Sequence, residues 1–209
     1  MNGGSVAHLH GAWSTLKGTN ADASVVYRLS DASSGRSAAF ARIGDNLLHL
    51  LNDDKRLAIG NASWSYTLSR TSALRRDVPS EAAVARKAAG VFEGRTPCQE
   101  LARELGVSTR DDCVKLKWRL TLLEDPATGT PTTYKLEGTL YRDRPLIGRW
   151  SMARDGHTNR IVYRLDLERS ATLSFVNADD NILFFLDSNG AYRVGNDAFS
   201  YTLNRSGGA

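Results

Sequence analysis

Apolar and polar residues alternate along most of this chain with a period of two. The alternation is clearest in residues 64–69 and 199–204, where an aromatic residue, Tyr and Leu take every second position and Ser, Thr and Asn take the others. A period of two is typical of a half-buried β-strand. In the first third of the chain it predicts strands at residues 8–14, 25–29, 38–43, 47–51, 56–59 and 63–70. We therefore expect an all-β fold.

The same pattern occurs twice in the chain. Residues 45–70 align without gaps with residues 180–205 at an offset of 135, and 11 of these 26 positions are identical. The match continues upstream at offsets of 136 and 137, in residues 25–29 with 161–165 and residues 11–14 with 148–151. Self-similarity of this kind predicts a duplicated β unit.

The second copy is expected to be complete. Further strands are predicted at residues 91–94, 114–124 and 132–142, ahead of the repeated strands that begin at Pro145, and residues 99–105 have the spacing of a short helical loop. Eight or nine strands in this order predict an antiparallel up-and-down β-barrel, which leaves no open sheet edge.

The first copy lacks a counterpart of residues 91–142. We expect either that sequence ahead of Met1 is missing or that the first copy is a partial barrel resting on the second. Its open edges should then pair with the second unit, with another chain or with the missing sequence. The predicted domains are residues 1–72 for the partial barrel, 73–90 for a linker with a helix at residues 80–89, and 91–209 for the complete barrel.

Composition and charge narrow the classes of partner. The net charge is +4 and the basic residues are spread along the chain without a block, so no nucleic-acid partner is predicted. No apolar run approaches the roughly 20 residues of a membrane span. Residues 1–5 do not resemble a signal peptide, so membrane anchoring is expected only if missing upstream sequence carries a lipoprotein signal.

The two cysteines are the first candidate site. Cys98 and Cys113 flank the short predicted helix and precede a long strand. This placement favours a disulfide that fastens the loop to the barrel, and closing a loop of about 15 residues is worth roughly 3 kcal/mol. Thiolate binding of Cu(I) and a buried reduced pair are the alternatives.

The histidines give a second candidate. His8 and His10 lie two residues apart on a predicted strand, so both side chains should point to one face, where they form a candidate metal pair. His49 lies in an apolar run and its counterpart in the repeat is Phe184, which predicts a place in the core.

Other polar and aromatic residues have structural explanations. Trp13, Trp118 and Trp150 fall on inward positions, where they are expected to fill a barrel rather than to line a ligand site. Asp and Asn before the strands at residues 47 and 182 are explained by turns. The sequence has no Ser/His/Asp spacing, phosphate-binding loop or zinc signature, so neither an enzyme nor a cofactor other than copper is predicted.

Several short motifs follow one another in a specific order. They are Phe92–Cys98, Glu124–Gly129, Tyr134–Thr139, Gly148–Trp150, Val162–Leu165, Asn181–Leu183 and Tyr201–Arg205. This order resembles the N-terminal domain of NlpE, the copper-resistance and envelope-stress lipoprotein of Gram-negative bacteria. The resemblance covers residues 91–205 in full, and its latter half again in residues 8–70.

The resemblance implies a lipocalin-like β-barrel without catalytic activity, in the periplasm or at the outer membrane, with a role in copper tolerance or surface sensing. The family carries Pro-Cys-x-x-Cys after the first strand, whereas here Pro97 and Cys98 are followed by Gln99, Glu100 and Leu101. The sequence therefore departs from the family at its copper-binding motif.

Two functional hypotheses follow from the sequence. The first is a non-enzymatic NlpE-like envelope protein whose loop at residues 96–113 and barrel mouth contact an envelope protein or a metal. The alternative is a lipocalin-like carrier that holds a small apolar ligand inside the barrel. The space inside the barrel distinguishes them.

Overall fold

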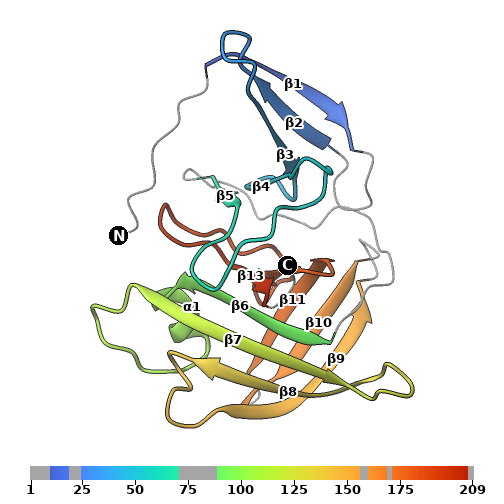
Figure 1. Ribbon diagram of the computed structural model, residues 1–209. Helices are drawn as coiled ribbons and strands as arrows, with labels where there is room; N and C mark the ends of the chain where they lie inside the picture. The colour runs from blue at the N-terminus through green and yellow to red at the C-terminus, as the bar shows by residue number, and fades with distance from the viewer. Residues whose placement is uncertain (1–9, 19–24, 71–88, 156–159, 169–170, 207–209) are drawn as a thin grey trace.

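The computed structural model describes residues 10–18, 25–70, 89–155, 160–168 and 171–206. The strands of this part of the chain form two antiparallel sheets, of which one is a closed barrel of eight strands (Figure 1). Its strands are β6 (Gly90–Pro97), β7 (Lys115–Glu124), β8 (Pro131–Gly138), β9 (Leu146–Arg154), β10 (Ile161–Asp166), β11 (Thr172–Asp179), β12 (Ile182–Leu186) and β13 (Thr202–Arg205), and the short helix α1 (Gln99–Glu104) follows β6. Pairing of β13 with β6 closes the barrel.

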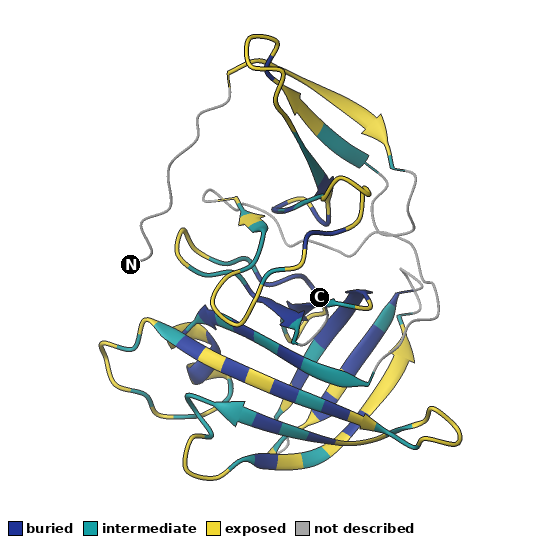
Figure 2. Cartoon of the chain, viewed as in Figure 1, coloured by how far each residue is buried: buried dark blue, intermediate teal, exposed yellow. Residues whose placement is uncertain are grey.

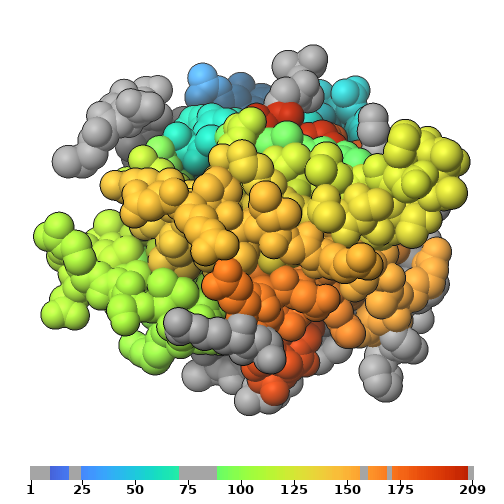
Figure 3. All heavy atoms as spheres, turned by 90° about the horizontal axis from the view of Figure 1, so that it is seen from below, coloured from blue at the N-terminus to red at the C-terminus, as the bar shows by residue number. Residues whose placement is uncertain are grey.

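Side chains fill the interior of the barrel. Along β7 every second residue from Leu116 to Leu122 is buried, as the alternating colours in Figure 2 show. All eight strands contribute to one apolar cluster, which includes Trp118 and Trp150 at 4% and 3% exposure. Seen from below, the barrel presents a continuous surface formed largely by β7, β8 and β9 (Figure 3). The all-β fold and the barrel are therefore as predicted.

The other sheet, here called the first sheet, has five strands paired in chain order. They are β1 (Ala12–Lys17), β2 (Val25–Ser30), β3 (Ser37–Arg42), β4 (Leu47–Leu50) and β5 (Thr67–Ser69). The strand predicted at residues 56–59 is wrong, because these residues contribute only an isolated bridge between Leu51 and Leu57. The linker helix predicted at residues 80–89 falls almost entirely outside the described residues.

The first sheet is paired as β9 to β13 of the barrel are paired. Leu48 is the partner of Leu68 in the first sheet, and Leu183 is the partner of Leu203 in the barrel. The turns after β4 and β12 also correspond. The amide of Lys55 donates to Asn52 O and that of Gly190 to Asp187 O, and Lys55 and Gly190 both have positive φ, 60° and 77°. The first sheet thus has the arrangement of five of the eight barrel strands.

The first sheet lies against the outside of the barrel. An apolar cluster joins Ala41, Ile43, Leu47 and Leu57 of the first sheet and its loops to barrel residues that include Val162, Val176, Ile182, Phe184 and Tyr192. Polar contacts cross the same interface. The amide of Gly60 donates to Asn204 Oδ1 (2.8 Å), and in the reverse direction the amide of Gly195 donates to Ser69 Oγ (3.1 Å).

Within the described residues, the edge strands β1 and β5 pair with no strand of the barrel. The first sheet is therefore held to the barrel by side-chain packing and loop hydrogen bonds, not by continuation of the barrel's β-ladder.

Candidate functional site

The two cysteines form a disulfide bond at one end of the barrel. Cys98 and Cys113 are bonded, with their Cα atoms 5.8 Å apart and a sequence separation of 15. The disulfide that the sequence favoured is thus confirmed, and neither cysteine is free. Because both sulfurs are bonded to each other, they do not supply the thiolate donors that a Cu(I) site needs. The donor set at this position does not fit copper.

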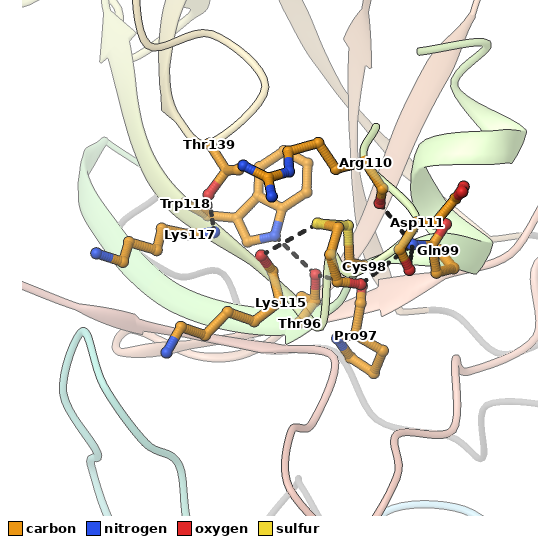
Figure 4. The surroundings of a disulfide bond; sticks show 11 residues. Thr96, Pro97, Cys98, Gln99, Arg110, Asp111, Lys115, Lys117, Trp118 and Thr139 are labelled. Carbon is orange, nitrogen blue, oxygen red and sulfur yellow. Dashed lines mark hydrogen bonds between the residues drawn. A yellow bond between two sulfur atoms is a disulfide. The ribbon is translucent and has the colours of Figure 1, made fainter. Parts of the chain in front are cut away.

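Hydrogen bonds and packing hold the disulfide loop in place (Figure 4). Beside the disulfide, Trp118 Nε1 donates to Thr96 Oγ1 at 2.8 Å. Gln99 Nε2 lies 3.0, 3.1 and 3.3 Å from the carbonyl oxygens of Arg110, Asp111 and Cys113. The side-chain amide of Gln99, at the start of α1, thus holds the end of the loop in place by hydrogen bonds. Leu101 and Ala102 of α1 are buried. The loop is therefore a fixed part of the surface.

An ion pair links α1 to the segment between β12 and β13. The side chain of Arg193 is 4% exposed and pairs with Glu104 of α1. Its Nε donates to Leu186 O at 3.2 Å, and its guanidinium group lies 5.6 Å from the centre of the Tyr201 ring. Nothing in the sequence pattern singles out Arg193, because its counterpart in the repeat is Ala58.

The tyrosines in the filled barrel have raised pKa values. Burial raises the pKa of Tyr163 and of Tyr201 to about 12. Tyr134 also has its pKa raised to about 12, chiefly by burial, and its hydroxyl donates to Asp166 O at 2.7 Å. These hydroxyls stay protonated near neutral pH, which suits a packed interior.

Of the predicted histidine pair, only His10 falls within the described residues. His10 is exposed ahead of β1, and His8 lies outside the described residues, so the geometry of the predicted pair is not defined. Among the described residues, no group of three or more His, Cys, Asp or Glu side chains is arranged to hold a metal ion.

His49 is a core residue, as predicted. Its side chain is fully buried, and burial lowers its pKa to about 4. Nε2 lies 2.9 Å from Ala58 O, and Nδ1 lies 2.9 Å from Thr67 Oγ1. Since a carbonyl oxygen only accepts, Nε2 carries the proton and Nδ1 accepts from the threonine hydroxyl. His49 also contacts Phe184 edge to face, with ring centroids 5.8 Å apart.

Trp13 does not fill a barrel, and that expectation is wrong. Trp118 and Trp150 are buried, whereas Trp13 is 67% exposed because the first sheet stays open on its concave side. A groove of about 510 Å³ lies there, lined by Trp13, Tyr27, Leu29, Leu48 and Leu68 among others.

No family model, curated protein or solved structure matches this chain. Fold and site together define a closed eight-stranded antiparallel β-barrel with a disulfide-fastened loop and an attached open sheet. In the described part of the chain, no helix has the length and apolar character to cross a membrane.

Proposed function

We propose that this protein is a non-enzymatic cell-envelope protein of NlpE-like type, which acts in copper tolerance or in sensing envelope stress or surfaces by binding a protein partner. The order of motifs from residue 92 to residue 205 supports the family assignment. The common pairing of the first sheet and of β9 to β13 supports a duplicated β unit. The eight-stranded antiparallel barrel is the form expected of a lipocalin-like domain.

The disulfide is the observation that carries the proposal. Disulfides persist in oxidising compartments, such as the bacterial periplasm, and are rare in the cytosol. Cys98 is 2% exposed and its bond to Cys113 closes the loop that bears α1. This supports a place in the periplasm or at the outer membrane.

Binding of a protein fits the site better than binding of a metal. The sulfurs are bonded to each other, and the loop presents a fixed surface with Val114 at 67% exposure and charged side chains such as Arg110 and Asp112. The filled interior argues against the carrier hypothesis, because a lipocalin-like carrier needs space inside its barrel.

Thiol titration with and without copper tests the choice between partner and metal. Protein purified without reductant and then unfolded should show no reactive thiol, and two after reduction. In competition with a Cu(I) chelator, the oxidised protein should leave the copper on the chelator. Two reactive thiols in the native protein that copper protects would overturn the proposed partner function in favour of metal binding.

A reporter assay tests the envelope function itself. The full chain, exported to the periplasm of a Gram-negative strain that lacks its own NlpE-type protein, should restore induction of an envelope-stress reporter. A Cys98→Ser/Cys113→Ser variant should lose induction because the loop loosens, and a His8→Ala/His10→Ala variant should keep it. Induction no higher than in the strain without the protein would refute the proposal.

A further inference from the structure

The concave face of the first sheet carries the residues of a barrel interior. In the barrel, nine core residues from Trp150 onward have counterparts among the described residues of the first sheet and its loops. Seven of these nine counterparts are identical. They are Trp13 and Trp150, Tyr27 and Tyr163, Leu29 and Leu165, Phe40 and Phe175, Leu48 and Leu183, Tyr66 and Tyr201, and Leu68 and Leu203.

The two sets differ in their exposure. Every barrel member of the seven pairs is at most 3% exposed, whereas Trp13 is 67%, Leu68 52% and Leu29 37% exposed. An apolar face of this kind on a folded protein marks an interaction site. Nothing in the packing of the first sheet on the barrel explains these residues, because that contact uses the opposite, convex face, with Ala41 and Leu47.

The barrel shows what covers such a face. Its equivalent strands run from β9 to β13, and the circle is closed by β6, β7 and β8, whose inward residues include Phe92, Leu120, Leu122, Tyr134 and Leu136. The first sheet ends at β1 and β5, the counterparts of β9 and β13, and within the described residues neither has an outer neighbour. By this comparison, the described strands of the first sheet are three fewer than those of the closed barrel.

We propose that the concave face of the first sheet binds a three-stranded antiparallel β-segment with the alternating apolar pattern of residues 90–138. The segment adds its outer strands to the edges of β5 and β1, which have no outer neighbour among the described strands, and completes a second eight-stranded barrel. Backbone hydrogen bonds along the two edges supply affinity, and the inward side chains supply specificity, as in other cases of strand addition.

Two residues of the groove are placed for this occupant. In the barrel, the Arg205 guanidinium group lies 4.6 Å from the centre of the Phe92 ring of β6. Its counterpart Arg70 lines the groove, where it meets the aromatic residue of the first incoming strand. Trp150 Nε1 donates to Leu123 O of β7 at 2.8 Å, and the counterpart Trp13 is placed to donate to the second incoming strand.

The test supplies the missing strands from the chain itself. A second copy of residues 89–144 replaces residues 1–7, ahead of His8, because β6 to β8 precede β9 in the barrel. Trp64→Phe, which copies Phe199, and Trp118→Phe in the added copy leave Trp13 as the exposed indole. The extended chain should lose the acrylamide-quenchable emission of Trp13, shift its emission to shorter wavelength and lose binding of anilinonaphthalene sulfonate. A matched control with Leu120→Asp and Leu136→Asp in the added copy should keep all three signals.

Three outcomes overturn the proposal. The first is an extended, folded chain in which Trp13 stays quenchable. The second is an unextended chain that sediments as a dimer, hides Trp13 and becomes monomeric with Trp13→Arg, since a second copy then covers the face. The third outcome is seen in the unextended chain, where Trp13→Ser should leave the melting temperature unchanged and Trp150→Ser should lower it by many degrees. If both variants lower the melting temperature by a similar amount, the concave face is part of the chain's own core and the proposal is overturned.

Discussion

His49 is a buried residue at the contact between the first sheet and the barrel. Its neutral imidazole is part of a hydrogen-bonded series, since Thr202 Oγ1 lies 3.0 Å from Thr67 Oγ1, and Thr67 in turn donates to His49 Nδ1. Burial disfavours the charged imidazole, and the lowered pKa reflects that cost. The residue therefore makes the stability of the interface dependent on pH.

The pKa of His49 falls from 6.5 in the unfolded chain to about 4 in the folded protein. Between these values the unfolded state binds more protons, so acid favours unfolding. We expect the contribution to be constant above pH 6.5 and to shrink by roughly 3 kcal/mol as the pH falls to 4. Urea unfolding from pH 7.5 to 4.5 measures it.

His49→Phe, which copies Phe184, should flatten this pH dependence. Asp31 should not contribute to the change in stability between pH 7.5 and 4.5. Hydrogen bonds from serine hydroxyls lower its pKa to about 2, so its effect on stability falls at lower pH. An equal slope in the His49→Phe variant and the parent protein would contradict the assignment.

At the residue scale, the sequence predicted the burial of His49, whose counterpart in the repeat is Phe184. It failed for Trp13, because the inward direction of a side chain follows from alternation, whereas burial depends on strands that lie elsewhere. It also missed Arg193, since a buried arginine is recognised only by its partners Glu104 and Leu186.

At the scale of elements, strand ends depended on turns that alternation does not reveal. Residues 63–70 alternate throughout, but β5 covers only Thr67–Ser69. The reason is Asn61, whose Oδ1 accepts from the amides of Ser63 and Trp64 at 2.7 and 3.2 Å and so forms a turn. Asn196 does the same for Ala198 and Phe199 in the barrel. A side-chain turn competes with the ladder at these positions.

The short helix α1 depends on its ion pair with the barrel. Glu104→Gln should lower the free energy of unfolding by about 1–3 kcal/mol, because it leaves the buried Arg193 guanidinium without its charged partner. Glu100→Gln is the matched control on the same helix, since Glu100 lies 4.0 Å from Arg193 and its side chain is 70% exposed, and we expect almost no change. Chemical denaturation measures both, and equal losses would refute a specific role for Glu104.

At the scale of the whole molecule, the first sheet and the barrel meet with a local two-fold relation. Gly60 contacts Asn204 and Gly195 contacts Ser69. The second pair consists of the aligned counterparts of the first, at the sequence offset of 135. Reciprocal contacts of this kind are typical of the interface between two identical subunits. The interface within this chain thus has the form of a dimer interface.

Ser69→Ala and Asn204→Ala should each leave one amide at the interface without its acceptor. We expect each to cost about 1–3 kcal/mol, and Ser151→Ala at an exposed site of β9 to change little. The amides of Gly60 and Gly195 should be protected from hydrogen exchange in the parent protein and lose protection one at a time in the variants. Rapid exchange of both amides in the parent protein would show that the interface does not form in solution.

A two-fold relation places some residues opposite their own aligned counterparts. Ser65 Oγ lies 2.7 Å from Ser200 Oγ, and Thr67 faces Thr202 in the same way. A hydroxyl group both donates and accepts, so it can form a hydrogen bond with an identical hydroxyl group. Two lysines or two aspartates at the same positions would repel each other. Each of these two positions and its aligned counterpart therefore need side chains that are complementary to themselves, and a change made at both members of a pair acts twice at the same point.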